Sequence, residues 1–353
     1  MFNILLTLTP SLQRVLTTSV ILGFLAGSFG VFIVLKKQAL VGDSLAHAAL
    51  PGVVITYILF QSKSLEILLL GAALSGIIAI FLFNVIKKHS KIKNDATLAL
   101  ILAGFFGMGR LLLSVVQRSS GAGSAGLDSF IFGQTATILL KDMYLILGVT
   151  VFINIIIFIF WKEIKLQTFN NEFFNSLGFS SKIVNFVFSI LIVLVVVAGI
   201  QMIGIVLISA LLIAPAVAAR QWSHRLSVNF VTAGVIGAVS GLIGVFIGDS
   251  MSLPPGPTII VVLSTIVLIS LLFAPKNGVI IKQIKQHNYR ILVKKYGLLV
   301  NLYHNETCPQ KDGCKLDTFV ESGYVKFENN KYSLTDTGLV KVNMILGGKR
   351  YEQ

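Results

Sequence analysis

Long apolar runs, separated by short polar connectors, fill most of the first 275 residues. A helix needs roughly 20 apolar residues to cross the hydrocarbon layer of a membrane. The stretch 183–219 is too long for one crossing, and we divide it at 199–204, G-I-Q-M-I-G, where glycines favour a break. The pattern therefore predicts about nine spanning helices, at about residues 15–35, 44–60, 65–86, 96–117, 143–161, 183–200, 201–219, 229–248 and 257–274.

The composition agrees with this pattern. Hydrophobic residues make up 55% of the 353-residue chain, charged residues only 12%, and the mean hydropathy is +0.85. A soluble domain carries about twice that charged fraction. We therefore expect an all-α polytopic membrane protein with a small α+β tail: a membrane domain over 1–275 and a cytosolic domain over 276–353.

The formal net charge is +14, and its distribution over the connectors indicates orientation rather than a nucleic-acid partner. Connectors on one side of the predicted membrane carry eleven Lys and Arg, and those on the other side carry four. By the positive-inside rule the richer side is cytoplasmic, so we expect the amino terminus outside and the tail inside. The richer set is Lys36, Lys37, Lys87, Lys88, Lys91, Lys93, Lys162, Lys165, Lys182, Arg220 and Arg225; the other is Arg14, Lys63, Arg118 and Lys141.

The long inner connector, residues 162–182, carries an amphipathic segment. Its sequence N-N-E-F-F-N-S-L-G-F predicts a short helix over 172–177 that ends at Gly178, since glycine commonly terminates helices. Such a helix lies either on lipid or in a groove of a partner protein. The long outer connector, 117–142, begins with a Ser/Gly cluster and continues as a predicted surface helix.

An acid and a histidine stand at the start of the second apolar run. Asp43 and His47 are four residues apart in G-D-S-L-A-H-A-A-L-P-G, residues 42–52, so on a helix both leave the same face. Carboxylate and imidazole together suit a divalent transition metal, and ionisable groups inside a membrane segment are costly enough to suggest a function. In the alternative interpretation, the two side chains only hydrogen-bond each other or a neighbouring helix.

No phosphate-binding loop of the form G-x-x-x-x-G-K-[ST] occurs in the sequence. A transporter of this kind is therefore driven either by an ion gradient or by a separate ATPase. Gradient-driven carriers usually show internal repeats with broken helices at matching positions, and no convincing repeat occurs here. A separate ATPase requires a docking element on the cytosolic side, and residues 171–178 have the right position and character.

Four blocks of sequence resemble the permease subunits of the manganese/zinc/iron ABC importers, in family order. They are residues 30–52 (GVFIVLKKQALVGDSLAHAALPG), 172–179 (EFFNSLGF), 204–222 (GIVLISALLIAPAVAARQW) and 249–261 (DSMSLPPGPTIIV). The resemblance implies a non-catalytic permease in the bacterial plasma membrane, without a tightly bound cofactor, whose cargo is a divalent Mn, Zn or Fe ion. It also implies three partners: cytosolic ATPase subunits, an extracytoplasmic metal-binding protein, and a second permease that is an identical copy or a paired paralogue.

The resemblance also assigns residues. Asp43 and His47 match the acid and histidine that lie on the metal pathway of the family. The loop that engages the ATPase is matched by Asn171, Glu172, Phe173, Phe174, Leu177 and Gly178. From position alone, candidates for the outer mouth of the pathway are Gln201, Met202 and Asp249.

The tail has the composition of a soluble domain. Residues 289–303 predict a helix, 319–332 predict two short strands about an Asn-Asn turn, and a last helix begins at Asp336. This order resembles the winged-helix domain of the diphtheria-toxin-repressor type, which some permeases of the family carry at the carboxy terminus. Between 305 and 316 the chain is too short for a helix-turn-helix, so we expect a truncated module and no nucleic-acid partner. Cys308 and Cys314 are either reduced thiols or, with His304, a regulatory metal site.

Two rival functions belong to other classes. A gradient-driven secondary metal carrier would transport without any ATPase. A membrane-tethered, metal-responsive regulator would bind DNA through its tail, with strong salt dependence. Between manganese, zinc and iron, the mixed softness of one carboxylate and one imidazole makes no choice.

Overall fold

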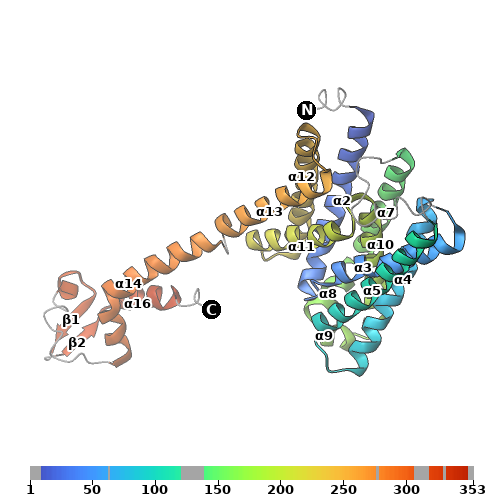
Figure 1. Cartoon of the computed structure of the whole chain (residues 1–353). Helices are drawn as coiled ribbons and strands as arrows, with labels where there is room; N and C mark the ends of the chain where they lie inside the picture. Colours follow the sequence, from blue (N-terminus) through green and yellow to red (C-terminus); the bar gives the residue numbers. More distant parts are fainter. Residues whose placement is uncertain are drawn as a thin grey trace. The chain divides into compact units, whose positions relative to one another are not determined.

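The computed structural model describes residues 9–62, 64–120, 139–275, 278–305, 318–328 and 331–348. The chain divides into two compact units, Met1–Leu271 and Leu272–Gln353. Within the described residues the first unit is helical, and the second combines helices with a two-stranded sheet (Figure 1). In chain order the first unit contains α2 (Pro10–Leu35), α3 (Val41–Phe60), α4 (Leu65–His89), α5 (Asn94–Ser120), α7 (Leu140–Ile159), α8 (Trp161–Phe169), α9 (Asn171–Ser176), α10 (Ser181–Ile203), α11 (Ile205–Trp222), α12 (Leu226–Ser250) and α13 (Pro255–Phe273).

Eight helices of the described chain are long and apolar enough to cross a membrane: α2, α3, α4, α5, α7, α10, α12 and α13. They correspond to eight of the predicted crossings, so the prediction of a polytopic, mostly helical membrane protein is confirmed. The remaining predicted crossing, 201–219, corresponds largely to α11. The part of α11 with described side chains, Ile208–Trp222, is apolar but shorter than a full membrane span. A total of nine crossings therefore stays a prediction.

The division predicted at 199–204 is confirmed at its last residue. Helix α10 ends at Ile203 and α11 begins at Ile205, with Gly204 between them at a φ of 89°. Residues other than glycine rarely adopt this backbone conformation, and a helix cannot continue through it, so the helix breaks at Gly204. The surface helix predicted for the outer connector, 121–138, lies outside the described residues.

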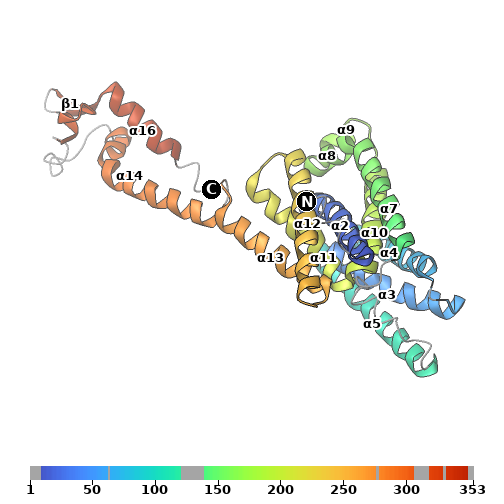
Figure 2. The same cartoon turned by 90° about the horizontal axis from the view of Figure 1, so that it is seen from above.

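Helix α2 occupies the middle of the membrane unit. Figure 2 shows it between α12 on one side and α7 and α10 on the other. It packs most extensively against α12, where Gly23 and Gly237 face each other so closely that a methyl group on either would overlap the other's backbone carbonyl oxygen. Lipid gives helices no hydrophobic reason to associate, so close backbone packing at small residues is the usual means of holding them together.

An aromatic cluster lies at the end of α2 that leads into α3. The ring of Phe32, which is fully buried, lies 5.6 Å from Trp161, 5.9 Å from Phe230 and 6.4 Å from Phe188, measured between ring centroids. These partners belong to α8, α12 and α10. Offset and edge-to-face aromatic pairs add about 0.5–1.5 kcal/mol each beyond the area they bury. The cluster therefore fixes the α2 end against three other helices.

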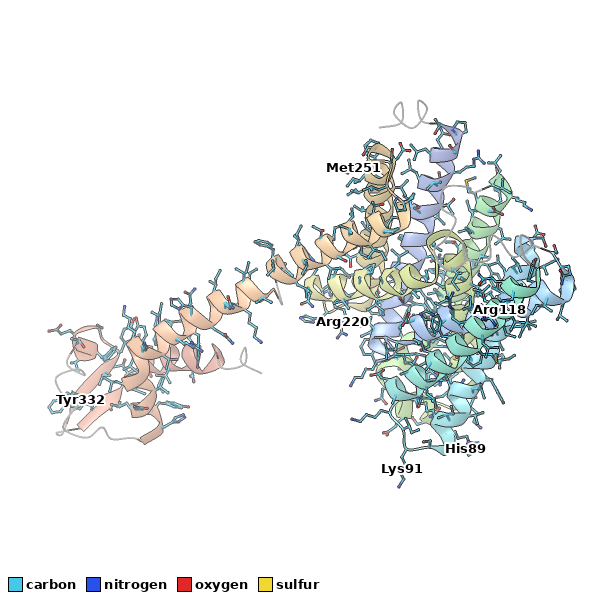
Figure 3. All side chains as sticks on the ribbon, viewed as in Figure 1. His89, Lys91, Arg118, Arg220, Met251 and Tyr332 are labelled. Carbon is cyan, nitrogen blue, oxygen red and sulfur yellow. The ribbon has the colours of Figure 1, made fainter. Side chains whose placement is uncertain are left out.

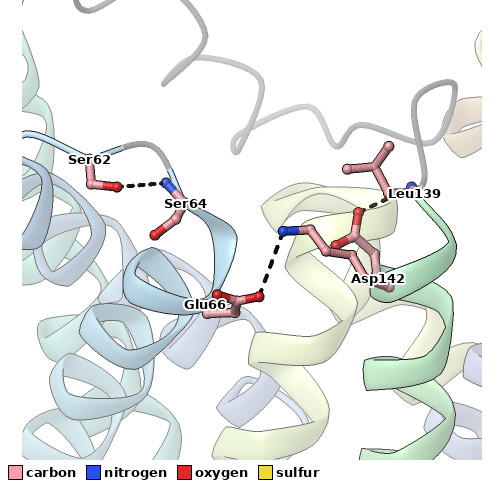
Figure 4. Close-up of polar contacts among 6 residues, drawn as sticks. Ser62, Ser64, Glu66, Leu139 and Asp142 are labelled. Atoms are coloured by element: carbon pink, nitrogen blue, oxygen red, sulfur yellow. Dashed lines mark hydrogen bonds and ion pairs between the residues drawn. The ribbon is translucent and has the colours of Figure 1, made fainter.

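The two ends of the membrane unit can be told apart by the residues that lie there. His89 and Lys91 lie at one end and Met251 at the other (Figure 3). At the start of α4, opposite His89, Glu66 forms a 3.7 Å ion pair with Lys141 of α7, and the carboxylate of Asp142 accepts the Leu139 N–H (Figure 4). The ion pair is well exposed, so it contributes at most about 1 kcal/mol.

The tail unit contains α14 (Val279–Asn305), β1 (Val325–Glu328), β2 (Lys331–Leu334) and α16 (Asp336–Gly348). The strands pair antiparallel, and Leu299, Val325 and Val342 form a small separate core. The predicted first helix, hairpin and last helix are thus confirmed as elements. The prediction that the strands begin at 319 is wrong, because residues 318–321 are helical and the strands occupy 325–328 and 331–334. Their assignment to a winged-helix domain stays a prediction, and Cys308 and Cys314 lie outside the described residues.

The contact between α2 and α12 is testable with one substitution. Gly237→Ala places a methyl group against the Gly23 carbonyl, so the helices must separate at a cost of about 1–3 kcal/mol. We expect a lower midpoint of thermal unfolding in detergent. The matched control is Gly148→Ala in α7, where the new methyl group meets no described atom within 4 Å. An equal midpoint for both variants would contradict the close contact.

Candidate metal site

Helix α3 begins after a tight turn, residues 36–40, that connects it to α2. Lys37 adopts a positive φ of 54° in this turn, and the Val41 N–H donates to the Gln38 carbonyl at 3.0 Å. Asp43 lies in the first turn of α3, where the positive end of the helix dipole stabilises a carboxylate. His47 follows one turn later on the same face.

The structure brings Asp43 and His47 together as the spacing predicts. His47 Nε2 lies 3.5 Å from Asp43 Oδ1. The side chain of His47 is 18% exposed and that of Asp43 is 33% exposed, so both are accessible although neighbours cover most of their surface. A separation of 3.5 Å exceeds the roughly 2.7–3.2 Å of a normal N–H···O hydrogen bond. The pair is therefore an open arrangement of two metal-ligand groups rather than a tight hydrogen bond between them.

The imidazole of His47 is held by an aromatic ring and keeps an unused nitrogen. Phe106 of α5 meets it edge-to-face, with ring centroids 4.9 Å apart at an interplanar angle of 77°. Among the described residues, the buried Nδ1 of His47 has no hydrogen-bond partner. An unpaired buried polar atom costs about 1–3 kcal/mol, which a ligand would recover.

Two serines hold this part of α3 between its neighbours. Ser44 Oγ donates to the Leu98 carbonyl of α5 at 2.9 Å, and Ser75 Oγ of α4 donates to the Ala48 carbonyl at 2.5 Å. All the atoms involved are buried, so these bonds are shielded from competing water. They fix the height of the Asp43–His47 pair relative to α4 and α5.

A proline inside α3 changes the backbone beside the pair. Pro51 has no N–H, so the carbonyl of His47 receives no helix hydrogen bond from it. Within the described chain, no cluster of three or more His, Cys, Asp or Glu side chains could hold a metal ion. Among the described His, Cys, Asp and Glu residues, the site therefore offers the two side chains of Asp43 and His47 as candidate ligands.

The predicted ATPase-docking segment forms helix α9, bounded as expected by Gly178, whose φ is 83°. Asn170 begins the helix by accepting the Phe173 N–H on its side-chain oxygen at 2.9 Å. Phe174 is fully buried and stacks on Phe179 with ring centroids 5.2 Å apart. Apart from Phe174, the side chains of this segment are exposed, among them Asn171, Glu172, Phe173 (50%) and Leu177 (51%).

The structure describes the side chain of one of the three residues predicted at the outer mouth. Asp249 is exposed in the last turn of α12. Gln201 and Met202 belong to the last turn of α10, but their side chains lie outside the described ones. Their assignment to an outer mouth stays a prediction.

Sequence reasoning missed Phe106, Ser44 and Ser75. Phe106 sits in an apolar run in which every position suits a membrane helix, so its contact with His47 leaves no sequence signal. Ser44 stands between Asp43 and His47 in the motif and could have been noticed there. Ser75 could not, because the carbonyl it reaches belongs to a helix face known only from the fold.

Comparison with known proteins covers the membrane unit. The sequence model of the ABC 3 transport family matches residues 9–274. The zinc transport system membrane protein TroC of Treponema pallidum is 44% identical over 271 residues, which cover 76% of this chain and 91% of TroC. The manganese transport system membrane protein MntC of Bacillus subtilis is 37% identical over 295 residues, covering 83% of this chain and 68% of MntC.

A solved structure has a similar fold. PsaBC from Streptococcus pneumoniae in complex with Fab superposes with a TM-score of 0.68 at 30% identity. The match covers 78% of this chain and 98% of that chain.

Proposed function

Because this chain belongs to the ABC 3 transport family, we propose that it is the permease subunit of an ABC importer for a divalent transition metal, Mn, Zn or Fe. It provides the membrane pathway, and a separate cytosolic ATPase drives it. The observation that carries the choice of cargo is the Asp43–His47 pair, 3.5 Å apart on a candidate membrane span and with an unused imidazole nitrogen.

The chemistry of the pair suits transport rather than storage. A structural zinc site is closed by four protein ligands and binds its ion tightly. One carboxylate and one imidazole per chain leave coordination positions to water, so an ion is held and then released. The carboxylate also offsets part of the cation's positive charge inside the membrane, where an unpaired charge costs several kcal/mol.

A second permease copy completes this site in our proposal. Asp43 keeps one third of its side chain exposed on a helix long enough to span the membrane. A carboxylate facing lipid at that position would be costly, so a protein surface has to cover it. An identical copy would bring a second acid and histidine to the same ion, and a paired paralogue would bring equivalent groups.

The proposed ATPase contact is the exposed surface of α9, which we call the docking surface: Phe173, Leu177 and Glu172. Phe173 and Leu177 expose about half of their apolar side chains although Phe174, between them, is fully buried. An exposed apolar pair with an adjacent carboxylate fits a groove on a partner better than bulk water. The side carrying α9 is then cytosolic, the amino terminus and the metal-binding delivery protein lie outside, and the tail lies inside.

For the tail we propose a regulatory or interaction module with a truncated winged-helix arrangement. Its support is the hairpin followed directly by α16 and a core of its own around Leu299. As a separate unit from residue 272 onward, it can change state without unfolding the permease.

Substitution of the metal pair tests the proposed function. Asp43→Ala and His47→Ala each remove one of the two side-chain ligands, so uptake of Mn²⁺ or Zn²⁺ into proteoliposomes containing the complete complex should be lost. Assembly with the ATPase and basal ATP hydrolysis should persist, because neither residue touches α9. Normal uptake by both variants would refute the metal pathway, and uptake by the permease alone would favour a gradient-driven carrier.

The docking surface is tested by two neighbouring phenylalanines. Phe173→Ala should weaken co-purification of the ATPase without lowering the unfolding midpoint, because its ring is half exposed. Phe174→Ala removes a buried ring, so it should reduce the free energy of unfolding by roughly 3–5 kcal/mol. We therefore expect this variant to lose ATPase binding together with a lower unfolding midpoint. Full ATPase binding by the stable Phe173→Ala variant would exclude this surface.

Deletion of residues 287–353 tests the tail. If the tail is regulatory, uptake should continue and its inhibition by excess intracellular metal should disappear. Uptake that is unchanged, with inhibition intact, would contradict a regulatory role. Salt-sensitive DNA binding that is lost on deletion would instead support the tethered regulator.

A further inference from the structure

Lys36 directly follows the last residue of α2, and its side chain turns into the protein. Its Nζ donates hydrogen bonds to Gln167 Oε1 of α8 at 3.2 Å and to Asn185 Oδ1 of α10 at 3.3 Å. The same ammonium lies 3.9 Å from the ring centroid of Phe188. Three contacts therefore tie one lysine to two other helices.

A charge at this place is not needed for membrane orientation alone. Lys37, the next residue, is exposed and already provides a positive charge at this end. Burial, together with the positive charge of Lys87, lowers the pKa of Lys36 to about 8. The Lys36 ammonium is held by two amide oxygens and an aromatic face.

From Lys36, hydrogen bonds lead to α9. Gln167, which accepts from Lys36, donates through Nε2 to the Ser181 carbonyl at 3.0 Å. Ser181 Oγ donates to Asn171 Oδ1 at 2.8 Å and is also bonded to Asn175 Oδ1, and both asparagines belong to α9. A chain of hydrogen bonds through Gln167 and Ser181 thus connects α9 to Lys36 at the end of α2.

In the other direction, the backbone leads from Lys36 to the metal pair. The Lys36 N–H donates to Phe32 O at 2.9 Å, and the Gln38 N–H donates to Ile33 O at 3.1 Å. The Val41 N–H then bonds Gln38 O, and Asp43 follows two residues later. The turn is closed by its own hydrogen bonds, so a displacement at Lys36 is passed to the first turn of α3.

We propose that Lys36 is a positioning residue that couples movement of α9 to the Asp43–His47 pair during metal transport. This inference rests on the proposed function. When the ATPase displaces α9, Ser181 and Gln167 carry the displacement to Lys36, and the turn carries it to Asp43. Without the ammonium, α9 still docks and the ATPase still turns over, but the pair does not follow.

The test is Lys36→Met, which keeps the length and the contact with Phe188 but removes the charge and the N–H donors. The complete complex is reconstituted in proteoliposomes, and Mn²⁺ uptake and ATP hydrolysis are measured on the same vesicles. We expect ATP hydrolysis to persist and Mn²⁺ moved per ATP to fall about tenfold, in the usual range for coupling between two sites. Mn²⁺ affinity of the complex in detergent should be unchanged.

Matched variants separate coupling from packing. Lys37→Met removes the neighbouring exposed charge and should leave Mn²⁺ per ATP unchanged, and Lys36→Arg should restore most of the coupling. Gln167→Leu breaks the next link and should reproduce Lys36→Met, and the double variant should be no worse than either single one, because both cut the same chain of bonds.

Three results would overturn the inference. Normal Mn²⁺ per ATP in Lys36→Met would show that the contacts do not couple. Loss of complex assembly or of Mn²⁺ affinity in that variant would show a structural role instead. If the unmodified complex hydrolyses ATP but transports neither Mn²⁺ nor Zn²⁺, the proposed function fails, and this inference fails with it.

Discussion

Hydrocarbon offers no hydrogen bonds, and this constraint decides where polar groups of the membrane unit lie. Some buried hydroxyls satisfy it locally by donating to a carbonyl one turn earlier in their own helix, as Ser28 does to Leu25 and Ser240 to Gly237. Ser44 and Ser75 satisfy it across helices and so fix α3. The Asp43–His47 pair differs from these hydroxyls, because it brings a carboxylate beside an imidazole whose Nδ1 has no hydrogen-bond partner among the described residues, and we propose that a cation uses this combination.

The same constraint explains how α2 organises the unit. Its middle packs backbone to backbone against α12 through glycines, and its end is surrounded by aromatic rings. Such a helix has little freedom to move by itself. In our proposal, movement that starts at α9 reaches α3 around the end of α2, where the turn 36–40 and the hydrogen bonds of Lys36 lie.

Much of this arrangement was predictable, for physical reasons. A membrane span needs a continuous apolar run, so the run lengths predicted eight of the helices. The glycines of 199–204 predicted a break within that stretch, and the structure places it at Gly204. The four-residue spacing predicted that Asp43 and His47 would meet, because a helix determines which side chains share a face. Phe106 could not be found in this way: the chain has 25 phenylalanines, and nothing local distinguishes the one that touches His47. Lys36 was counted among the orientation charges, since only the fold brings Gln167 and Asn185 to its side chain.

Pro51 has a mechanical consequence for α3. Because Pro51 cannot donate a hydrogen bond to the His47 carbonyl, α3 is easier to bend at this position than elsewhere along its length. The part of α3 before Pro51 carries Asp43 and His47, and the hydrogen bonds of Ser44 and Ser75 hold it to α5 and α4. The part of α3 after Pro51 is joined to the part that carries Asp43 and His47 by one backbone hydrogen bond fewer than in an unbroken helix, so bending α3 at this point costs less than bending it elsewhere.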